Sequence, residues 1–316
     1  MKTVNLIAAL LLLPLLASAG EKVDKTLEFI DDGYVDIANV NGQVKIVPWD
    51  NSSVKVSGEL GDNTKDFIFD RSGNRIRIKV EVKNGFNLFG GNTGGGDNLV
   101  INLPRKSRVS YASVNSNLSA ANIIGDISAN SVNGNLTIDH CQGKLKASTV
   151  NGAVTGDQLM GNLELSSVNG SINIKSSNGD QNAFSTVNGT LDVNAHSDEL
   201  KLSTVSGNVA VDVGEVRDLE FNGVSGNATI HLDLQKGGNV NATTVSGNLT
   251  LRFADNPSAH FNIDSPTGGS IINHLSNDQP VSDHYGPGKR LQFTSLNGEG
   301  RVSVTTISGA VTLEKK

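Results

Sequence analysis

Asp139, His140 and Cys141 are adjacent in the sequence, and they are residue types from which nucleophilic catalytic triads are built. Neighbouring residues of an extended strand point to opposite faces, so these three side chains cannot converge on one substrate without further partners. We therefore interpret the group as part of a variable turn with a semi-exposed thiol. Because Cys141 is the only cysteine, it cannot form a disulfide within the chain.

A second group contains residue types that bind metals. His274, Asp278, Asp283 and His284 lie close together in the sequence, and imidazole and carboxylate groups are suitable ligands for a metal ion. Their spacing matches no strong metal-binding signature. The pattern favours a solvated loop.

Two further motifs have a structural interpretation beside a functional one. Gly94-Gly95-Gly96-Asp97 is similar to calcium-binding Gly-Asp repeats, but those sites need several stacked copies and this motif occurs once, so we expect a loop. Arg75-Ile76-Arg77-Ile78-Lys79 is similar to a fragment of polysaccharide-cleaving β-helix enzymes, which also need paired carboxylates. No matching carboxylate motif is present, and alternating charge on an exposed strand explains the run. The sequence thus predicts no catalytic, cofactor-binding or metal-binding residue.

The elements that position these residues are repeats of a short phrase. A hydroxyl residue, Val, Asn or Ser, and Gly recur in this order, and the sequence numbers of successive glycines differ by 18, 18, 19, 18, 19 and 21. These glycines are Gly134, Gly152, Gly170, Gly189, Gly207, Gly226 and Gly247. Related copies occur at Ser113-Val114-Asn115-Ser116, Ser295-Leu296-Asn297-Gly298 and Thr306-Ile307-Ser308-Gly309. The spacing predicts a repeat array between positions 113 and 253, with a unit of about 18 to 21 residues.

Each unit is expected to hold two short strands. Apolar residues alternate after the Gly, as at Ile172 and Ile174, and again before the phrase, as at Leu163 and Leu165. We expect the Val of the phrase to point inward and the Gly to adopt a left-handed turn conformation. The Asn residues are expected to form a ladder, whose chemistry changes where Ser replaces Asn between residues 206 and 246.

Two all-β architectures fit this pattern. In a parallel β-solenoid each unit is one coil and equivalent strands stack about 4.8 Å apart. In an antiparallel meander or barrel each Asn-Gly closes a hairpin. Aromatic residues make up only 4% of the chain and Gly numbers 35, so the interior is thin and aliphatic. That composition favours the solenoid, because a barrel of this many strands needs more filling.

The regions before and after the array are less regular. Residues 20–112 read as an N-terminal β segment that starts the stack, with strand-like runs such as Tyr34 to Val40 and Leu99 to Leu103, and with a Gly- and Asn-rich loop over residues 84–98. Residues 254–316 read as a coil that carries a protruding loop, followed by the C-terminal coils. The regular repeats between them span residues 113–253.

The first residues resemble an export signal. Met1-Lys2, the apolar stretch from Ile7 to Leu16 and the small residues Ala17-Ser18-Ala19 predict a signal peptide over residues 1–19. Its loss removes Lys2 and takes the net charge from −6 to −7 with His neutral. No cluster of Lys and Arg suggests a nucleic-acid partner. No later apolar run is long enough to span a membrane as a helix.

Three segments in this order carry a family resemblance: IVPWDNSSVKVSGEL (46–60), NLVINLPRKSRV (98–109) and the repeated V-N/S-G strands. They resemble the bacterial putative-adhesin family of β-strand-repeat proteins, a domain family of unknown function. The resemblance implies a right-handed β-helix-like fold and a cell-envelope setting, and it transfers no binding residue to this chain.

The sequence therefore predicts an exported, non-enzymatic β-solenoid located in the periplasm or on the cell surface. We expect it to act as a structural or adhesion-like module that binds an envelope glycan or protein and uses no cofactor. The competing hypothesis is a carbohydrate-active enzyme on the same fold, with residues 254–290 covering a groove.

Overall fold

The computed structural model describes residues 20–83 and 95–316, and these residues form strands and turns without any helix. The predicted signal peptide and most of the predicted 84–98 loop lie outside the described residues. In chain order the strands are β1 (Glu21–Glu28), β2 (Tyr34–Trp49), β3 (Ser53–Leu60), β4 (Thr64–Ser72), β5 (Arg75–Val82), β6 (Asp97–Pro104), β7 (Arg108–Ala121), β8 (Ile127–Ser131), β9 (Leu136–Asp139), β10 (Leu145–Thr149), β11 (Val154–Asp157), β12 (Leu159–Met160), β13 (Leu163–Ser167), β14 (Ile172–Ile174), β15 (Ser177–Thr186), β16 (Leu191–Asn194), β17 (His196–Ser206), β18 (Val209–Ser225), β19 (Asn227–Thr244), β20 (Asn248–Phe253), β21 (Ala259–Ser265), β22 (Ser270–Asn273), β23 (Val281–Ser282), β24 (Lys289–Ser295), β25 (Gly300–Thr306) and β26 (Ala310–Lys315).

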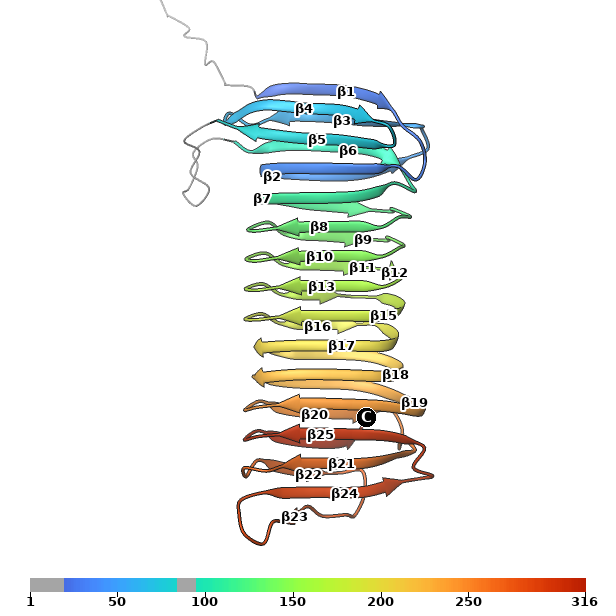
Figure 1. Ribbon diagram of the computed structural model, residues 1–316, viewed down its shortest axis with the longest axis vertical. Helices are drawn as coiled ribbons and strands as arrows, with labels where there is room; N and C mark the ends of the chain where they lie inside the picture. The colour runs from blue at the N-terminus through green and yellow to red at the C-terminus, as the bar shows by residue number, and fades with distance from the viewer. Residues whose placement is uncertain (1–19, 84–94) are drawn as a thin grey trace, which may run out of the picture.

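The repeats stack into a rod with two walls (Figure 1). The front wall consists of β8, β10, β13, β15, β17, the later parts of β18 and β19, and β25. The back wall consists of β9, β11, β14, β16, the earlier parts of β18 and β19, β20 and β26. Paired strands within each wall are parallel, as in Leu145 opposite Leu163, so the antiparallel meander is wrong for the array.

The core lies between the two walls, and each wall contributes one layer of side chains to it. Columns of small aliphatic residues fill it, as Leu145, Leu163, Leu200 and Leu219 do on the front wall. Aromatic residues gather where the stack must close at the C-terminal end: Phe261 stacks on Phe293 at 4.4 Å and meets Phe253 edge-on at 5.8 Å. A thin interior therefore needs few large side chains, as the composition indicates.

In several phrases the hydroxyl residue holds the turn from inside. At Thr149, Oγ1 accepts a hydrogen bond from Gly152 N in its own coil and donates one to Gly134 O in the coil before, both at 3.1 Å. Ser167 repeats the arrangement, with Gly170 N at 2.9 Å and Gly152 O at 3.1 Å. Because the hydroxyl residue points inward, the next residue along the strand points outward.

The outward residue is the Val of the phrase, so the inward orientation expected from the sequence is wrong. Val187 and Val205 are 37% and 44% exposed. The left-handed conformation expected at Gly189 is also wrong: among the phrase glycines of the array, Gly226 has a positive φ, at 115°, and Gly189 does not. Gly189 is required by close stacking instead, since a Cβ there would lie 1.8 Å from Gly170 O.

The predicted asparagine ladder is confirmed. Each side-chain amide donates to the one before it, from Asn133 to Asn115 at 2.6 Å, Asn151 to Asn133 at 2.7 Å and Asn169 to Asn151 at 2.9 Å. Where Ser replaces Asn, the shorter hydroxyl donates to backbone, as Ser246 Oγ does to Val224 O at 3.2 Å. The chemistry of the ladder thus changes along the rod, as the sequence indicates.

At the N-terminal end, the order of stacking differs from the order in the chain. β2 lies directly on β7, with Val35 opposite Val109, and it is covered on its other side by β5 and β6. β3 then pairs antiparallel with β6, and β1 pairs antiparallel with β3. Within the N-terminal segment β2 therefore lies inside, and residues 53–104 together with β1 form the outer layers.

The C-terminal end has the same inversion. β25 and β26 stack directly on β19 and β20, with Val302 opposite Val240 and Val311 opposite Leu249. The earlier strands β21 and β22 lie beyond them, and β24 and β23 complete this end with antiparallel pairs. The expectation that the last units end the rod is therefore wrong, and the sheet is mixed rather than purely parallel.

Candidate binding face

The structure separates the adjacent residues Asp139, His140 and Cys141. Cys141 points into the core at 4% exposure, where its Sγ donates to Asp139 O at 3.2 Å, and burial raises the pKa of the thiol. His140 occupies the turn with a φ of 54°. The three side chains do not form a triad, and the semi-exposed thiol expected from the sequence is in fact buried.

The other metal-binding candidates are held by separate contacts. His274 N donates to Leu313 O at 2.8 Å, the Asp278 carboxylate accepts from Ser276 Oγ at 2.8 Å, and the His284 ring meets Tyr285 edge-on. Within residues 20–83 and 95–316, no three His, Cys, Asp or Glu side chains are grouped to hold a metal ion.

Asp97 and the basic residues of β5 have structural roles. Gly94 lies outside the described residues, whereas Asp97 is buried and its Oδ1 accepts from Gly61 N and Thr64 Oγ1, both at 2.8 Å. On β5, Arg77 pairs with Asp70 at 2.6 Å and Lys79 with Glu81 at 2.8 Å. Asp97 fixes the turn between β3 and β4, and the basic residues pair across and along the N-terminal strands.

The surface best suited to bind a partner is the front wall. Its outward residues form columns along the rod, because equivalent strands stack in register. One column is mostly charged and contains Lys146, Glu164, Ala183, Lys201 and Glu220. The next column is hydroxylic or amidic and contains Ser148, Ser166, Ser185, Ser203 and Asn222.

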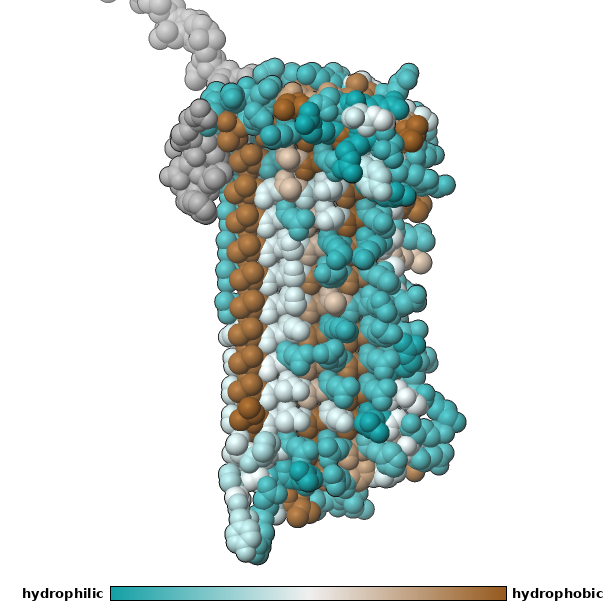
Figure 2. Space-filling model, viewed as in Figure 1, coloured by the Kyte–Doolittle hydropathy of each residue, from teal (hydrophilic) through white to brown (hydrophobic). Residues whose placement is uncertain are grey.

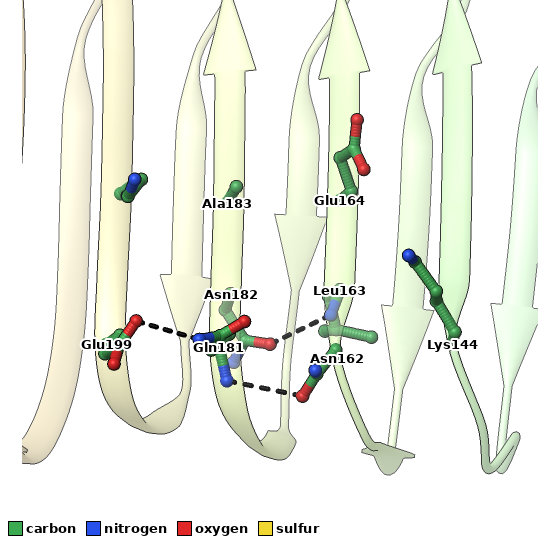
Figure 3. Close-up of a pocket in the computed structure, with 9 residues that line it drawn as sticks. Lys144, Asn162, Leu163, Glu164, Gln181, Asn182, Ala183 and Glu199 are labelled. Atoms are coloured by element: carbon green, nitrogen blue, oxygen red, sulfur yellow. Dashed lines mark hydrogen bonds between the residues drawn. The ribbon is translucent and has the colours of Figure 1, made fainter.

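Shallow hollows lie along this wall. The hollow in Figure 3, of about 280 Å³, is lined by residues of β13, β15 and β17 together with Lys144 and Asn162. Its rim carries both signs of charge, from Lys144 and Lys201 and from Glu164 and Glu199. We call it the central hollow. It combines charged, amide and aliphatic groups in the middle of the array.

A single inserted residue lies beside the central hollow. Leu159 pairs with Ser177, but Leu163 pairs with Asn182. The offset between partners grows by one from the first pair to the second, so β15 carries one extra residue between these points. Asn182 consequently lies in a core column where its neighbours are leucines. Ala183, the next residue, leaves a gap between Glu164 and Lys201 in the charged column.

The side chain of Asn182 accepts a hydrogen bond that a backbone carbonyl accepts in the coil before, where Leu145 N donates to Asn162 O. Asn182 is 2% exposed, and its Oδ1 accepts from Leu163 N at 3.1 Å (Figure 3). Its Nδ2 has no hydrogen-bond partner. A buried amide with an unpaired donor costs free energy, so this rung is less stable than its neighbours. The sequence contains one signal of this site, the longer spacing from Gly170 to Gly189, but the spacing does not show that Asn182 enters the core.

The carboxylates around the central hollow are paired with neighbouring residues. Glu164 forms an ion pair with Lys146, and Glu199 accepts from Arg217 at 2.6 Å and from Gln181 at 3.0 Å. Beside them, the hydrogen bond from Asn239 and then the contact with Arg217 lower the pKa of Asp218. These carboxylates are engaged by cationic and amide groups, which suits recognition of a polar partner better than proton transfer.

Coils that stack in parallel and present repeated polar columns define a β-solenoid-like protein. The chain belongs to the Toastrack DUF4097 family, whose profile matches residues 34–314. This confirms the resemblance to a putative-adhesin family of unknown function.

The comparisons also include solved structures. A putative adhesin from Parabacteroides merdae ATCC 43184 is 13% identical, with a TM-score of 0.45, covering 74% of this chain and 93% of its own. A putative adhesin from Parabacteroides distasonis ATCC 8503 is 14% identical, with a TM-score of 0.39, covering 94% and 98%. A putative lipid binding protein from the same strain is 12% identical, with a TM-score of 0.40, covering 94% and 97%. No curated protein matches the chain.

Proposed function

We propose that the protein is an exported cell-envelope β-solenoid that acts as an adhesion-like interaction module, with its front wall as the binding surface. The observation that carries this proposal is the row of shallow hollows along one wall, with the central hollow where the repeat is interrupted. Sites where a regular repeat breaks its own rules are often functional.

The partner that fits this wall is an extended polymer with repeating polar groups, and we propose an envelope glycan. Hydroxyl, amide and charged side chains recur on each coil, so successive units of a long chain meet similar groups. Many weak contacts of this kind add up when they are joined on one chain. A protein with an extended polar segment is the other partner that this chemistry admits.

Several features complete the proposal. Residues 1–19 act as a cleaved signal peptide and place the protein in the periplasm or on the cell surface. The coils wind in the right-handed sense that is usual for parallel connections. The N-terminal segment 20–112, the repeats 113–253 and the C-terminal segment 254–316 serve one binding rod. No part of the described chain forms an apolar helix long enough for a membrane span.

The test is a binding screen of the full chain against glycans and envelope polymers, with released sugar ends measured in the same wells. The variant Ala183→Arg fills the central hollow, and Ala210→Arg places the same charge on the exposed back wall. We expect Ala183→Arg to weaken binding at least about tenfold and Ala210→Arg to leave it unchanged. Equal effects of both variants would remove the front wall as the site, and release of sugar ends would show a carbohydrate-active enzyme instead.

A further inference from the structure

Along one edge of the rod, ten stacked coils carry no charged residue. In each coil the six residues that end the front strand and form the phrase turn are Ala, Ser, Thr, Asn, Gln, Val, Ile or Gly, and we call these segments together the edge band. They are residues 38–43, 112–117, 130–135, 148–153, 166–171, 185–190, 203–208, 222–227, 243–248 and 305–310. Charged side chains lie on the rest of the surface, and the whole chain carries a net charge of −6.

A column of exposed aliphatic side chains runs through the edge band. Its members are 37% to 44% exposed over seven successive coils, and Figure 2 shows them as a brown stripe beside the paler hydroxyl columns. These members are Val150, Val168, Val187, Val205, Val224, Val245 and Ile307. Contiguous exposed apolar residues of this extent on a soluble protein mark a surface that another molecule covers.

The turn itself does not require an aliphatic residue at this position. The hydroxyl residue before it and the Gly after it supply the buried contacts, as Thr149 and Gly152 do in their coil. The neighbouring outward column is filled by Ser, Asn and Thr, which extend equally well along a strand. The recurrence of Val or Ile, and not a polar residue, therefore indicates contact with a partner.

A second copy of this chain fits the edge band best. Two molecules with net negative charge repel each other least when they meet through surfaces that carry no charge, and this band carries none. A second copy also has the same repeat of about 4.8 Å along its own column, so the two rows of valines interdigitate without loss of register. No other partner is certain to share this period.

The size of the edge band is adequate for a specific dimer. The ten stacked segments are separated by nine steps of about 4.8 Å, so the band is about 40 Å long, and six residues at about 3.3 Å each make it at most about 20 Å wide. The resulting area is at most about 800 Å² per copy, which reaches the size of a standard protein interface. A membrane surface is a poorer occupant, because interfacial binding relies on Trp, Lys and Arg, which the band lacks.

We propose that the protein forms a homodimer in which two rods pair along their edge bands. This pairing buries the aliphatic column and the adjoining groove lined by Ser166, Val168 and Val187. It also covers the hydroxylic column that contains Ser148 and Ser166, but it leaves the charged column and the central hollow open and brings two front walls into one assembly. If a polymer binds the front wall, two linked walls bind it more tightly than one.

Sedimentation velocity of the full chain tests the proposal over about 1 to 100 μM, the range in which interfaces of this size are often found. We expect about twice the mass of 33.1 kDa for the wild type. The triple variant V168K/V187K/V205K is expected to weaken association at least about 100-fold. Its matched control, A210K/T229K/T250K, places three lysines on neighbouring rungs of the back wall and is expected to remain dimeric.

A milder triple variant, V168T/V187T/V205T, keeps the β-branched shape and guards against loss of folding. Thermal unfolding of every variant shows that the rod is intact, and the threonine variant is expected to dissociate more readily than the wild type. A wild type that stays monomeric at about 100 μM overturns the proposal. A dimer that the edge-band variant V168K/V187K/V205K and the back-wall variant A210K/T229K/T250K weaken equally also overturns the proposal. So does a dimer that neither variant weakens, because another surface then forms the contact.

Discussion

Thr149 shows at the scale of one residue why each phrase begins with a hydroxyl. Its buried oxygen satisfies the N–H of Gly152 and the carbonyl of Gly134, so it joins two coils. Thr204 holds the equivalent position, but its buried Oγ1 has no hydrogen-bond partner. The two residues thus have the same shape and burial and differ in their hydrogen bonds.

This pair gives a matched test of the hydroxyl. Thr149→Val is expected to lower the free energy of unfolding by about 1 to 3 kcal/mol, because it leaves a buried N–H unpaired. Thr204→Val is expected to be neutral or stabilising, because it removes an unsatisfied group. Urea unfolding of both variants measures the difference. Similar losses in the two variants would contradict this role of the hydroxyl.

Gly189 illustrates a requirement for space instead of backbone freedom. A Cβ there would meet Gly170 O at 1.8 Å, so Gly189→Ala must push two coils apart, at a cost of about 1 to 3 kcal/mol. Gly95→Ala is the control, because a Cβ at Gly95 meets no atom of residues 20–83 or 95–316 within 4 Å and its φ is not left-handed. Thermal unfolding should show a clear loss of stability only for Gly189→Ala. An unchanged melting temperature would mean that the coils are further apart there.

At the scale of elements, the C-terminal end of the rod is closed by strands that are not the last in the chain. β25 and β26 lie between β19 and β21 and between β20 and β22, although they are the last strands of the chain. Val302, Val311 and Leu313 are fully buried there. In chain order the outer layer therefore precedes the inner one, and the inner strands β25 and β26 are paired on both sides.

Hydrogen exchange tests this order. Amides of residues 300–315 are expected to exchange at least about tenfold more slowly than those of residues 281–295, because an interior coil opens only with its neighbours. The usual expectation for a C-terminus is the reverse, since chain ends fray. Mass spectrometry of peptides from the two segments measures both rates. Faster exchange over residues 300–315 would show that the last coil is loosely attached.

The sequence predicts the strands of the array well and the ends of the rod poorly. Alternation such as Leu163 and Leu165 depends on contacts within one strand, so it is visible in the sequence. The insertion of β25 between β19 and β21 depends on pairing between segments far apart in the chain, as from Val240 to Val302, and no local pattern encodes it. Asn182 illustrates the same limit at the central hollow, since its burial follows from a shift of register.

At the scale of the whole molecule, the rod behaves as a sum of coils and of interfaces between neighbours. Around β10 the offset between coils is constant, since Leu145 pairs with Ile127 on one side and with Leu163 on the other. One whole coil can therefore be removed there without changing which residues face the core. Deletion of residues 147–164 removes one such repeat, joins Lys146 to Leu165 and restores the alternation of the front strand. We expect this variant to fold, with a rod shorter by about 4.8 Å and a modest loss of stability.

The control removes one residue fewer. Deletion of residues 147–163 joins Lys146 to Glu164, which reverses the faces of the strand and places Glu164 where Ala147 is buried. An unpaired carboxylate in the core costs several kcal/mol, so this variant is expected to lose its cooperative transition. Small-angle scattering for length and thermal unfolding for cooperativity distinguish the two variants. If both deletion variants fold equally well, the turns accommodate a shift of register. The constant spacing of the array is then not what keeps its coils aligned.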